Sequence, residues 1–166
     1  MSRYSVQQNS ITPTATADAT NLADGSYFAA IQGGNGTQRV NIHEIFLGGQ
    51  ATASAPTNWE LARDSVVGAT PGSFAGTVAM TDGSGTAPAT VPVVNDHFTT
   101  KPQRSATSKL LNLSFNAYGG VVRWVASPDE VISVVGNTAS LGEVSLSAFT
   151  GGSPGACGGH ILYEVP

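Results

Sequence analysis

Hydrophobic and polar residues alternate with a period of two in many short stretches of this chain. Residues 39–49 (RVNIHEIFLGG) and 119–136 (GGVVRWVASPDEVISVVG) are two examples, and Gly, Pro and Asn clusters bound such stretches. This alternation is typical of β-strands, because successive side chains of a strand point to opposite faces of a sheet. It predicts strands near 3–7, 26–32, 39–48, 58–64, 75–80, 108–116, 121–126, 130–135, 141–149 and 159–165.

Helical periodicity is hard to find. The best candidate, NWELARDSVV at 58–67, is short, and Gly68 and Pro71 follow it closely. Alternating strand and helix units are absent, which disfavours a parallel α/β sheet. About eight to ten short strands separated by turn signals predict an all-β, single-domain sandwich of the jelly-roll type.

Two segments lack strand patterning and divide the chain. Residues 8–24 are rich in Thr and Ala, which predicts that 1–24 form an N-terminal strand followed by an extended arm. Residues 25–166 then form the jelly-roll domain, which contains a long Gly/Pro-rich loop at 81–107. Three prolines in this loop remove backbone donors, so it cannot be a central strand. Loops of this length are usually functional or anchored to a partner.

The charge content excludes several classes of protein. Charged residues make up only 11% of the chain, against about 25% in a typical domain, and the net charge is −4. Lys and Arg do not cluster as a nucleic-acid binder requires. No stretch approaches the ~20 apolar residues of a membrane span, and the N-terminus lacks the apolar run of a signal peptide. We therefore expect neither nucleic acid nor membrane as a partner, and synthesis in a cytoplasm.

The residues that could carry chemistry do not converge. Strict alternation places His43 and Glu44 on opposite faces of one strand, so they cannot share a metal ion or act as a base and its orienting group. Ser153 lies in a G-x-S-x-G pattern, but Pro154 follows it and has no N–H for an oxyanion hole. Cys157 is three residues before His160 without a cation or helix terminus to activate it. We expect no catalytic residue, no cofactor and no metal site.

The three histidines, His43, His97 and His160, leave one alternative open. No two of them have a metal-ligand spacing, but distant segments or a threefold axis could bring copies together.

The order of segments resembles the small jelly-roll virion proteins of tailed bacteriophages, including trimeric cement (decoration) proteins on the outside of the capsid. A short arm precedes RVNIHEIFLGG, followed by NWELARDSVVGATPG and a loop with APATVPV. LLNLSFNAYGGVVRWVASPDEVISVVG and the terminal GGHILYEVP complete the likeness over residues 25–166. The resemblance implies a jelly roll, a homotrimer, and binding to the major capsid protein on the exterior of the virion.

Under this resemblance we assign two sets of residues. The arm and the Pro-rich loop are expected to contact the capsid through Thr12, Pro13, Thr14, Pro88 and Pro92. The trimer interface is expected on apolar strand faces. The expected interface residues are Phe115, Arg123, Trp124 and Phe149. For two of them another role is open: Trp124 is also a candidate core residue, and Arg123 could equally lie on the free surface.

Three other functions compete with decoration of a phage head. The first is a tail or fibre-associated jelly-roll protein that binds host-surface glycans, which exposed aromatic residues would favour. The second is a cupin-like or hydrolytic β-barrel enzyme, against which the diverging His43 and Glu44 count. The third is a capsid shell subunit, which the missing basic arm disfavours.

Overall fold

A computed structural model of the chain describes residues 2–83, 85–137, 140–150 and 153–166. Among these residues there is no helix, and the elements are thirteen strands: β1 Ser2–Ile11, β2 Ala29–Gln32, β3 Arg39–Gly49, β4 Pro56–Val66, β5 Ala69–Pro71, β6 Thr77–Met80, β7 Val93–Asn95, β8 Phe98–Thr100, β9 Gln103–Asn116, β10 Val121–Val125, β11 Ile132–Val135, β12 Glu143–Ala148 and β13 Cys157–Val165.

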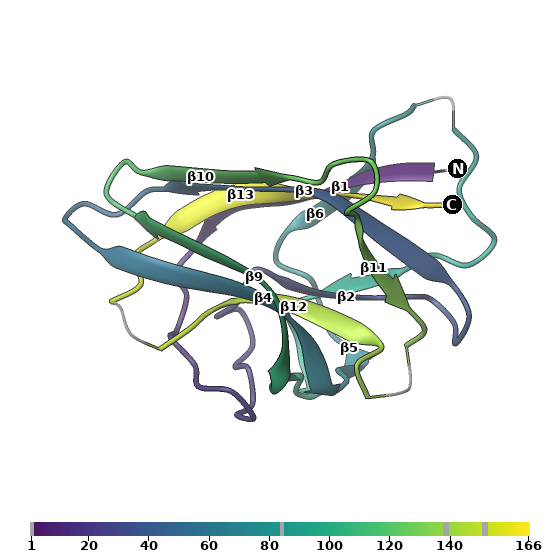
Figure 1. The fold of residues 1–166 in the computed structure, drawn as a ribbon, viewed down its shortest axis with the longest axis horizontal. Coiled ribbons are helices and arrows are strands. Elements are labelled where there is room, and N and C mark those ends of the chain that lie inside the picture. Colours follow the sequence, from purple (N-terminus) through teal and green to yellow (C-terminus); the bar gives the residue numbers. More distant parts are fainter. Residues whose placement is uncertain (1, 84, 138–139, 151–152) are drawn as a thin grey trace.

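The strands form two antiparallel sheets that pack face to face (Figure 1). The first sheet has the order β10-β3-β13-β1-β6, and β11 pairs with β3 beyond the end of β10. The second sheet has the order β7-β2-β12-β4-β9. A separate pair, β5 and β8, lies apart from both sheets. The all-β class predicted from the alternation is confirmed, and several antiparallel sheets are present.

The core lies between the two sheets and follows the alternation of apolar residues. Trp59 and Leu61 of β4 pack in one cluster with Ile45 and Leu47 of β3 and Ile161 of β13, all of them fully buried. Burial of side chains of this size contributes about 1.5–3 kcal/mol each. The ten predicted strands are all present, and the helix candidate at 58–67 lies in strand β4.

The predicted arm lies against its own domain. Strand β1 extends to Ile11 and pairs with both β13 and β6, so the N-terminal segment belongs to the sandwich. Residues 12–28, here called the covering segment, then cross the outer face of the second sheet, which is the face turned away from the core. Backbone hydrogen bonds hold this segment down: Thr16 N–H donates to Ala148 O (3.0 Å), and Leu22 N–H donates to Pro102 O (3.0 Å).

The covering segment buries a second, smaller apolar cluster and a row of polar groups. The cluster consists of Leu22, Tyr27, Ala30 and Phe98, with Val93 packed against it. Beside it lies Arg104, whose side chain is completely buried. Its guanidinium donates to Thr16 O and to Ser147 Oγ, and its Nε lies 3.3 Å from Asp18 Oδ1. One arginine therefore fixes the covering segment to the second sheet.

The predicted long loop at 81–107 is partly regular. It contains β7, β8 and the first residues of β9, and Pro92 is buried while Pro88 is half-buried. β7 pairs with β2 at the edge of the second sheet, as expected for a strand beside prolines.

Candidate functional site

The outer face of the first sheet carries converging polar side chains from strands β1, β3, β10 and β13. A bulge in β3 creates this arrangement. On β13, Leu162 pairs with Glu44 and Tyr163 pairs with Ile42, so His43 is the extra residue. Such a residue shifts every side chain beyond it to the other face.

The bulge corrects the prediction of strict alternation in this strand. Ile42 and Ile45 are both fully buried although they are three residues apart. His43 and Glu44, which lie between them, do not diverge to opposite faces: both reach carboxylate or imidazole groups on the outer face. The inference that an extended backbone must separate this pair is therefore wrong.

Glu44 is the centre of the outer face. Its carboxylate accepts two hydrogen bonds from Arg123, from Nε and Nη2, both at 2.9 Å. His160 Nε2 lies 3.1 Å from the same carboxylate, on the neighbouring strand β13. The hydrogen bonds from Arg123 are the main reason that the pKa of Glu44 lies below its ordinary value, and the interaction with His160 adds to the effect. Glu44 is therefore held as a carboxylate.

A second carboxylate on the same face has the same kind of surroundings. Glu164 of β13 accepts a hydrogen bond from Arg3 Nε of β1 at 3.1 Å, and His43 Nε2 is 3.9 Å from it. The Glu164 side chain is only 8% exposed, and that of Glu44 is 12% exposed. Each glutamate thus lies beneath an arginine and a histidine of its own chain.

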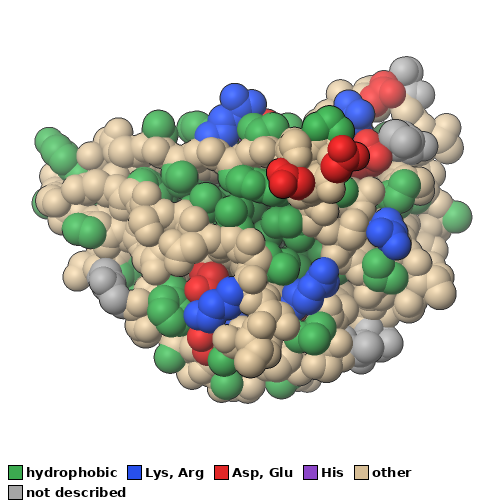
Figure 2. Space-filling model, in the orientation of Figure 1, with side chains coloured by type: hydrophobic (Ala, Val, Ile, Leu, Met, Phe, Trp, Pro, Cys, Tyr) green, Lys and Arg blue, Asp and Glu red, His purple; other side chains and the backbone are tan. Residues whose placement is uncertain are grey.

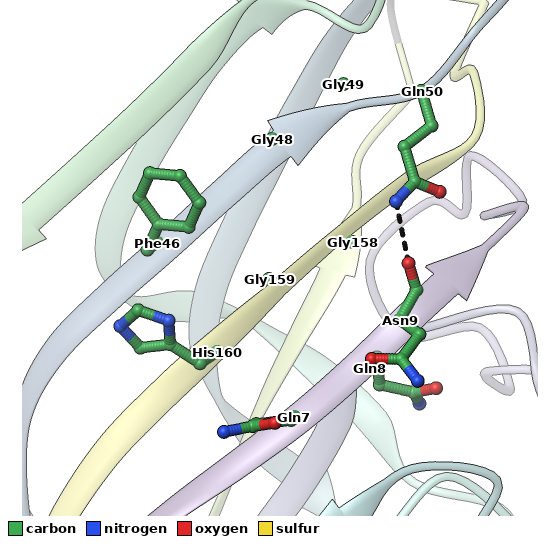
Figure 3. A pocket seen from close by; sticks show the side chains of 10 residues that line it. All are labelled: Gln7, Gln8, Asn9, Phe46, Gly48, Gly49, Gln50, Gly158, Gly159 and His160. Atoms are coloured by element: carbon green, nitrogen blue, oxygen red, sulfur yellow. Dashed lines mark hydrogen bonds between the residues drawn. The ribbon is translucent and has the colours of Figure 1, made fainter.

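A shallow hollow of about 430 Å³ lies next to Glu44 (Figure 3). The rings of Phe46 and His160 stack beside it, with centroids 5.5 Å apart. Four glycines of β3 and β13 leave bare backbone along it, and amide side chains border it, with Gln50 Nε2 donating to Asn9 O at 2.7 Å. Its lining residues are Gln7, Gln8, Asn9, Phe46, Gly48, Gly49, Gln50, Gly158, Gly159 and His160.

Exposed valines surround this polar centre. Val121 and Val125 of β10 flank Arg123, and their partners on β3 are Gly48 and Glu44. Val135 of β11 lies opposite Arg39. The exposed fractions of these valines are 66%, 54% and 45% respectively. The face therefore combines exposed valines with two glutamates that are paired within the chain and with Arg39, which is exposed.

The predicted interface residues are not brought together. Arg123 lies on the uncovered face and pairs with Glu44. Trp124 and Phe115 are partly buried and pack against the core, as expected of a core anchor at Trp124. Phe149 belongs to the other side of the molecule, where Lys109 Nζ lies 4.2 Å from the centre of its ring.

The predicted capsid-contact residues lie at opposite ends of the sandwich. Thr12, Pro13 and Thr14 follow Ile11, which pairs with Cys157 at the start of β13. Thr12 and Thr14 are exposed, whereas Pro13 is buried. Pro88 lies beside Val165, at the end of β13, and Pro92 follows in the same loop.

The other groups considered for chemistry are separated. Cys157 is fully buried in the core, where burial raises the pKa of its thiol to about 12, while His160 reaches Glu44 on the outer face. His97 Nδ1 lies 2.7 Å from Asp96 Oδ1, far from the other two histidines in the fold. Over the described ranges, no three His, Cys, Asp or Glu side chains are grouped so that they could hold a metal ion.

The clustering of Glu44 with His160 was missed because the two residues are 116 positions apart, and the place of His43 on the same face was missed because it depends on the bulge. A signal was present in the sequence: VNIHEIFL places two polar residues between Ile42 and Ile45, which breaks the period of two.

Comparisons of the chain with protein-family models, with curated proteins and with solved structures find no match. No helix among the described residues has the length and apolar character needed to cross a membrane.

Proposed function

We propose that this chain is a non-enzymatic decoration (cement) protein of a bacteriophage head, which binds the outside of the shell as a homotrimer. One observation carries the proposal: the two sheets differ in what covers them. The covering segment and β8 lie over the outer face of the second sheet, while no segment of the described part of the chain covers the outer face of the first sheet, which carries exposed valines. A bare face of this kind favours assembly with another protein surface.

The strand orders support a jelly roll. In the first sheet β10, β3, β13 and β1 are neighbours, and in the second β2, β12, β4 and β9 are neighbours. Successive strands β1, β2, β3 and β4 alternate between the two sheets, and β12 and β13 do the same at the other end of the chain. Two sheets of four principal strands, connected by crossings of this kind, are typical of jelly rolls.

We assign the homotrimer contact to the bare face of the first sheet. Burying a charge is unfavourable unless it is paired, and both glutamates of this face are already paired with arginines of the same chain. A second copy can therefore cover these two glutamates without needing to supply a counter-charge. Each valine that becomes covered contributes about 1–2 kcal/mol.

A decoration role follows from such a trimer by linkage. A protein that binds the assembled shell and not its free subunits stabilises the shell by the free energy of its own binding. Three identical contacts in one particle add avidity, because the second and third contacts are intramolecular once the first has formed. This role requires surfaces rather than a pocket with reactive groups.

Sedimentation equilibrium tests the homotrimer. The unmodified protein is expected at three times the 16.9 kDa of one chain. Val125→Glu places a carboxylate on the proposed contact and is expected to give monomers. Val91→Glu is the matched control, since Val91 is 56% exposed and Val125 is 54% exposed; it should leave the trimer intact. A monomeric unmodified protein, or equal behaviour of both variants, would contradict the assignment.

Thermal denaturation of phage heads tests the decoration role. Heads that lack this protein should lose their contents at a lower temperature than heads to which the purified protein has been added back. Electron microscopy of the same heads should show the added copies spread over the shell. Identical melting temperatures, or a few copies at a single vertex, would contradict decoration.

Binding of host glycans is a second candidate, favoured by the hollow beside Glu44. Stacked rings and amide side chains, here Phe46, His160 and Gln7, are groups that can contact a neutral sugar. Titration of the protein with neutral oligosaccharides distinguishes the two functions. Saturable binding that Phe46→Ala abolishes, together with unaltered head stability, would favour the glycan function.

A further inference from the structure

The sequence has several runs of 13 or more residues without a charge, and four of these runs contribute to one end of the fold. Residues 4–17, 45–59, 110–122 and 144–163 contain no Lys, Arg, Asp or Glu. The runs are separated along the chain, so their relation to one another becomes apparent only in the fold.

The fold brings these runs together at one end of the sandwich. Ile11 pairs with Cys157, Gly49 pairs with Cys157 from the other side, and Pro56 pairs with Asn116. The loops that continue from these paired residues therefore lie next to one another. We define the uncharged end as residues 9–14, 49–56, 116–120 and 153–157. Figure 2 shows this end at the left of the view, where the visible surface has neither basic nor acidic side chains.

Hydrogen bonds join the loops of the uncharged end to one another. Ala51 N–H donates to Ala117 O (2.9 Å), and Ala117 N–H donates to Ala55 O (2.9 Å). Asn116 crosslinks two loops: its Oδ1 accepts from Ala55 N–H (2.9 Å) and its Nδ2 donates to Ser54 Oγ (2.9 Å). These bonds hold the loops in one arrangement before any partner binds.

Small residues pack these loops closely. A Cβ added to Gly155 would lie 2.7 Å from the Cβ atoms of both Ala51 and Ala55, and 3.1 Å from that of Ala117. Such distances leave no room for a larger residue. Outside this tightly packed layer, Tyr118 projects with 61% of its surface exposed.

The opposite end of the sandwich has a different character. Arg39 is exposed at the start of β3, and Arg3, near the start of β1, has a side chain that is 69% exposed. Pro88 and Ala89 lie at this end in the long loop. Charges here are solvated, and any partner would have to desolvate or pair them.

From this contrast we infer that the uncharged end is the surface that docks on the capsid, and that its partner is an uncharged, polar protein surface. The inference rests on the proposed decoration function. The centres of protein interfaces are depleted in charged residues and enriched in tyrosine; this end has no charged residue and exposes Tyr118. A preformed loop arrangement also lowers the entropy lost on binding.

The inference selects between the two predicted capsid contacts. Thr12 and Thr14 belong to the uncharged end, whereas Pro88 and Pro92 lie at the opposite end. Since the two sets lie at opposite ends of the sandwich, they cannot both rest on the same patch of a shell. Docking through the uncharged end uses Thr12 and Thr14 and leaves the Pro-rich loop directed away from the capsid.

Binding of the trimer to purified heads that lack it provides the test, by co-sedimentation at increasing protein concentration. Ala53→Glu puts one carboxylate on an exposed position of the uncharged end and is expected to weaken binding at least about tenfold, because the carboxylate would be buried without a counter-charge. Tyr118→Ala is expected to weaken binding by a similar factor. Ala89→Glu, also at an exposed position but at the opposite end, is the matched control and should bind as the unmodified protein does.

The outcomes separate the inference from the function on which it rests. Binding of the unmodified protein should be nearly unchanged between about 0.05 and 0.5 M salt, since no ion pair crosses the contact. If Ala53→Glu and Tyr118→Ala remain trimeric and bind as tightly as Ala89→Glu, the uncharged end is not the docking surface, although decoration stands. Loss of binding in Ala89→Glu alone would place docking at the opposite end. If the unmodified trimer does not bind heads, decoration itself is wrong.

Discussion

The buried carboxyl pair Asp64 and Glu143 predicts that stability falls as the pH rises. Both side chains are completely buried on the outer face of the second sheet, beneath the covering segment. Glu143 Oε1 accepts from Gly68 N–H (2.8 Å), and Asp64 Oδ1 accepts from Ser145 Oγ (2.7 Å). Among the described residues no donor reaches Asp64 Oδ2 or Glu143 Oε2. A proton shared by the two carboxyl groups supplies the missing donor.

Burial and the neighbouring Asp64 carboxylate raise the pKa of Glu143 to about 9, and burial also raises the pKa of Asp64. The folded protein therefore keeps a proton that the unfolded chain releases near pH 4.5, so this contribution to stability is complete below that pH. It is lost as the pH rises through about 9. Over this window the free energy of unfolding should fall by at most about 1.4 kcal/mol per pH unit for each retained proton.

Glu143→Gln tests this reasoning. The carboxamide is neutral at every pH, can still accept from Gly68, and can donate to Asp64. The fall in unfolding free energy from pH 5 to pH 8 should therefore be smaller in the variant than in the unmodified protein. Urea denaturation at fixed protein concentration measures both profiles. Glu130→Gln, which changes an exposed turn residue, is the control. Parallel profiles for Glu143→Gln and the unmodified protein would refute the shared proton.

Three further predictions concern single residues. Arg104→Met should lower the free energy of unfolding by about 3–5 kcal/mol and expose residues 17–24 to protease, because the buried partners of Arg104 lose their charge-assisted hydrogen bonds. The control is Lys101→Met, which removes a partly exposed ion pair and should lower the free energy of unfolding by under about 1 kcal/mol. Gly49→Ala should lower the midpoint of urea denaturation, because the added methyl group would overlap the backbone of Ala117. Gly36→Ala is the control and should leave the midpoint unchanged, since no atom lies within 4 Å of a methyl group added there. Cys157 should resist alkylation in the folded protein and react on unfolding, since its thiol is buried and its pKa is raised to about 12.

The sequence predicts the strands well because alternation is a local property. Residues 39–48 and 159–165 were assigned from neighbours two positions apart, and the structure places β3 and β13 there. The same local rule failed at His43, where one extra residue in the strand moved it and Glu44 relative to their neighbours. In the sequence the bulge is visible only in the spacing of the buried residues: Ile42 and Ile45 are three positions apart, whereas strict alternation would place them two apart.

The site depends on contacts that no local pattern contains. Glu44 and His160 are 116 positions apart, and the ion pair between Arg3 and Glu164 joins the two ends of the chain. The position of the covering segment on the second sheet depends on the hydrogen bond from Arg104 to Thr16 O, and these two residues are 88 positions apart. A Thr/Ala-rich segment has the same composition whether it reaches outward or packs on its own sheet, so composition could not reveal the outcome.

The placement of apolar residues on the first sheet supports the proposal that a second copy covers its outer face. Strands at the edge of a sheet normally carry charges or prolines that prevent pairing with other chains. β10 lies at an edge, yet Val121 and Val125 flank its single arginine, and that arginine is already engaged by Glu44. On a solvated face such an ion pair contributes little to stability, and the valines remain in contact with water. In the proposed trimer a second copy would remove the valines from water, while the pairing of Arg123 with Glu44 would limit the cost of desolvating these two charges.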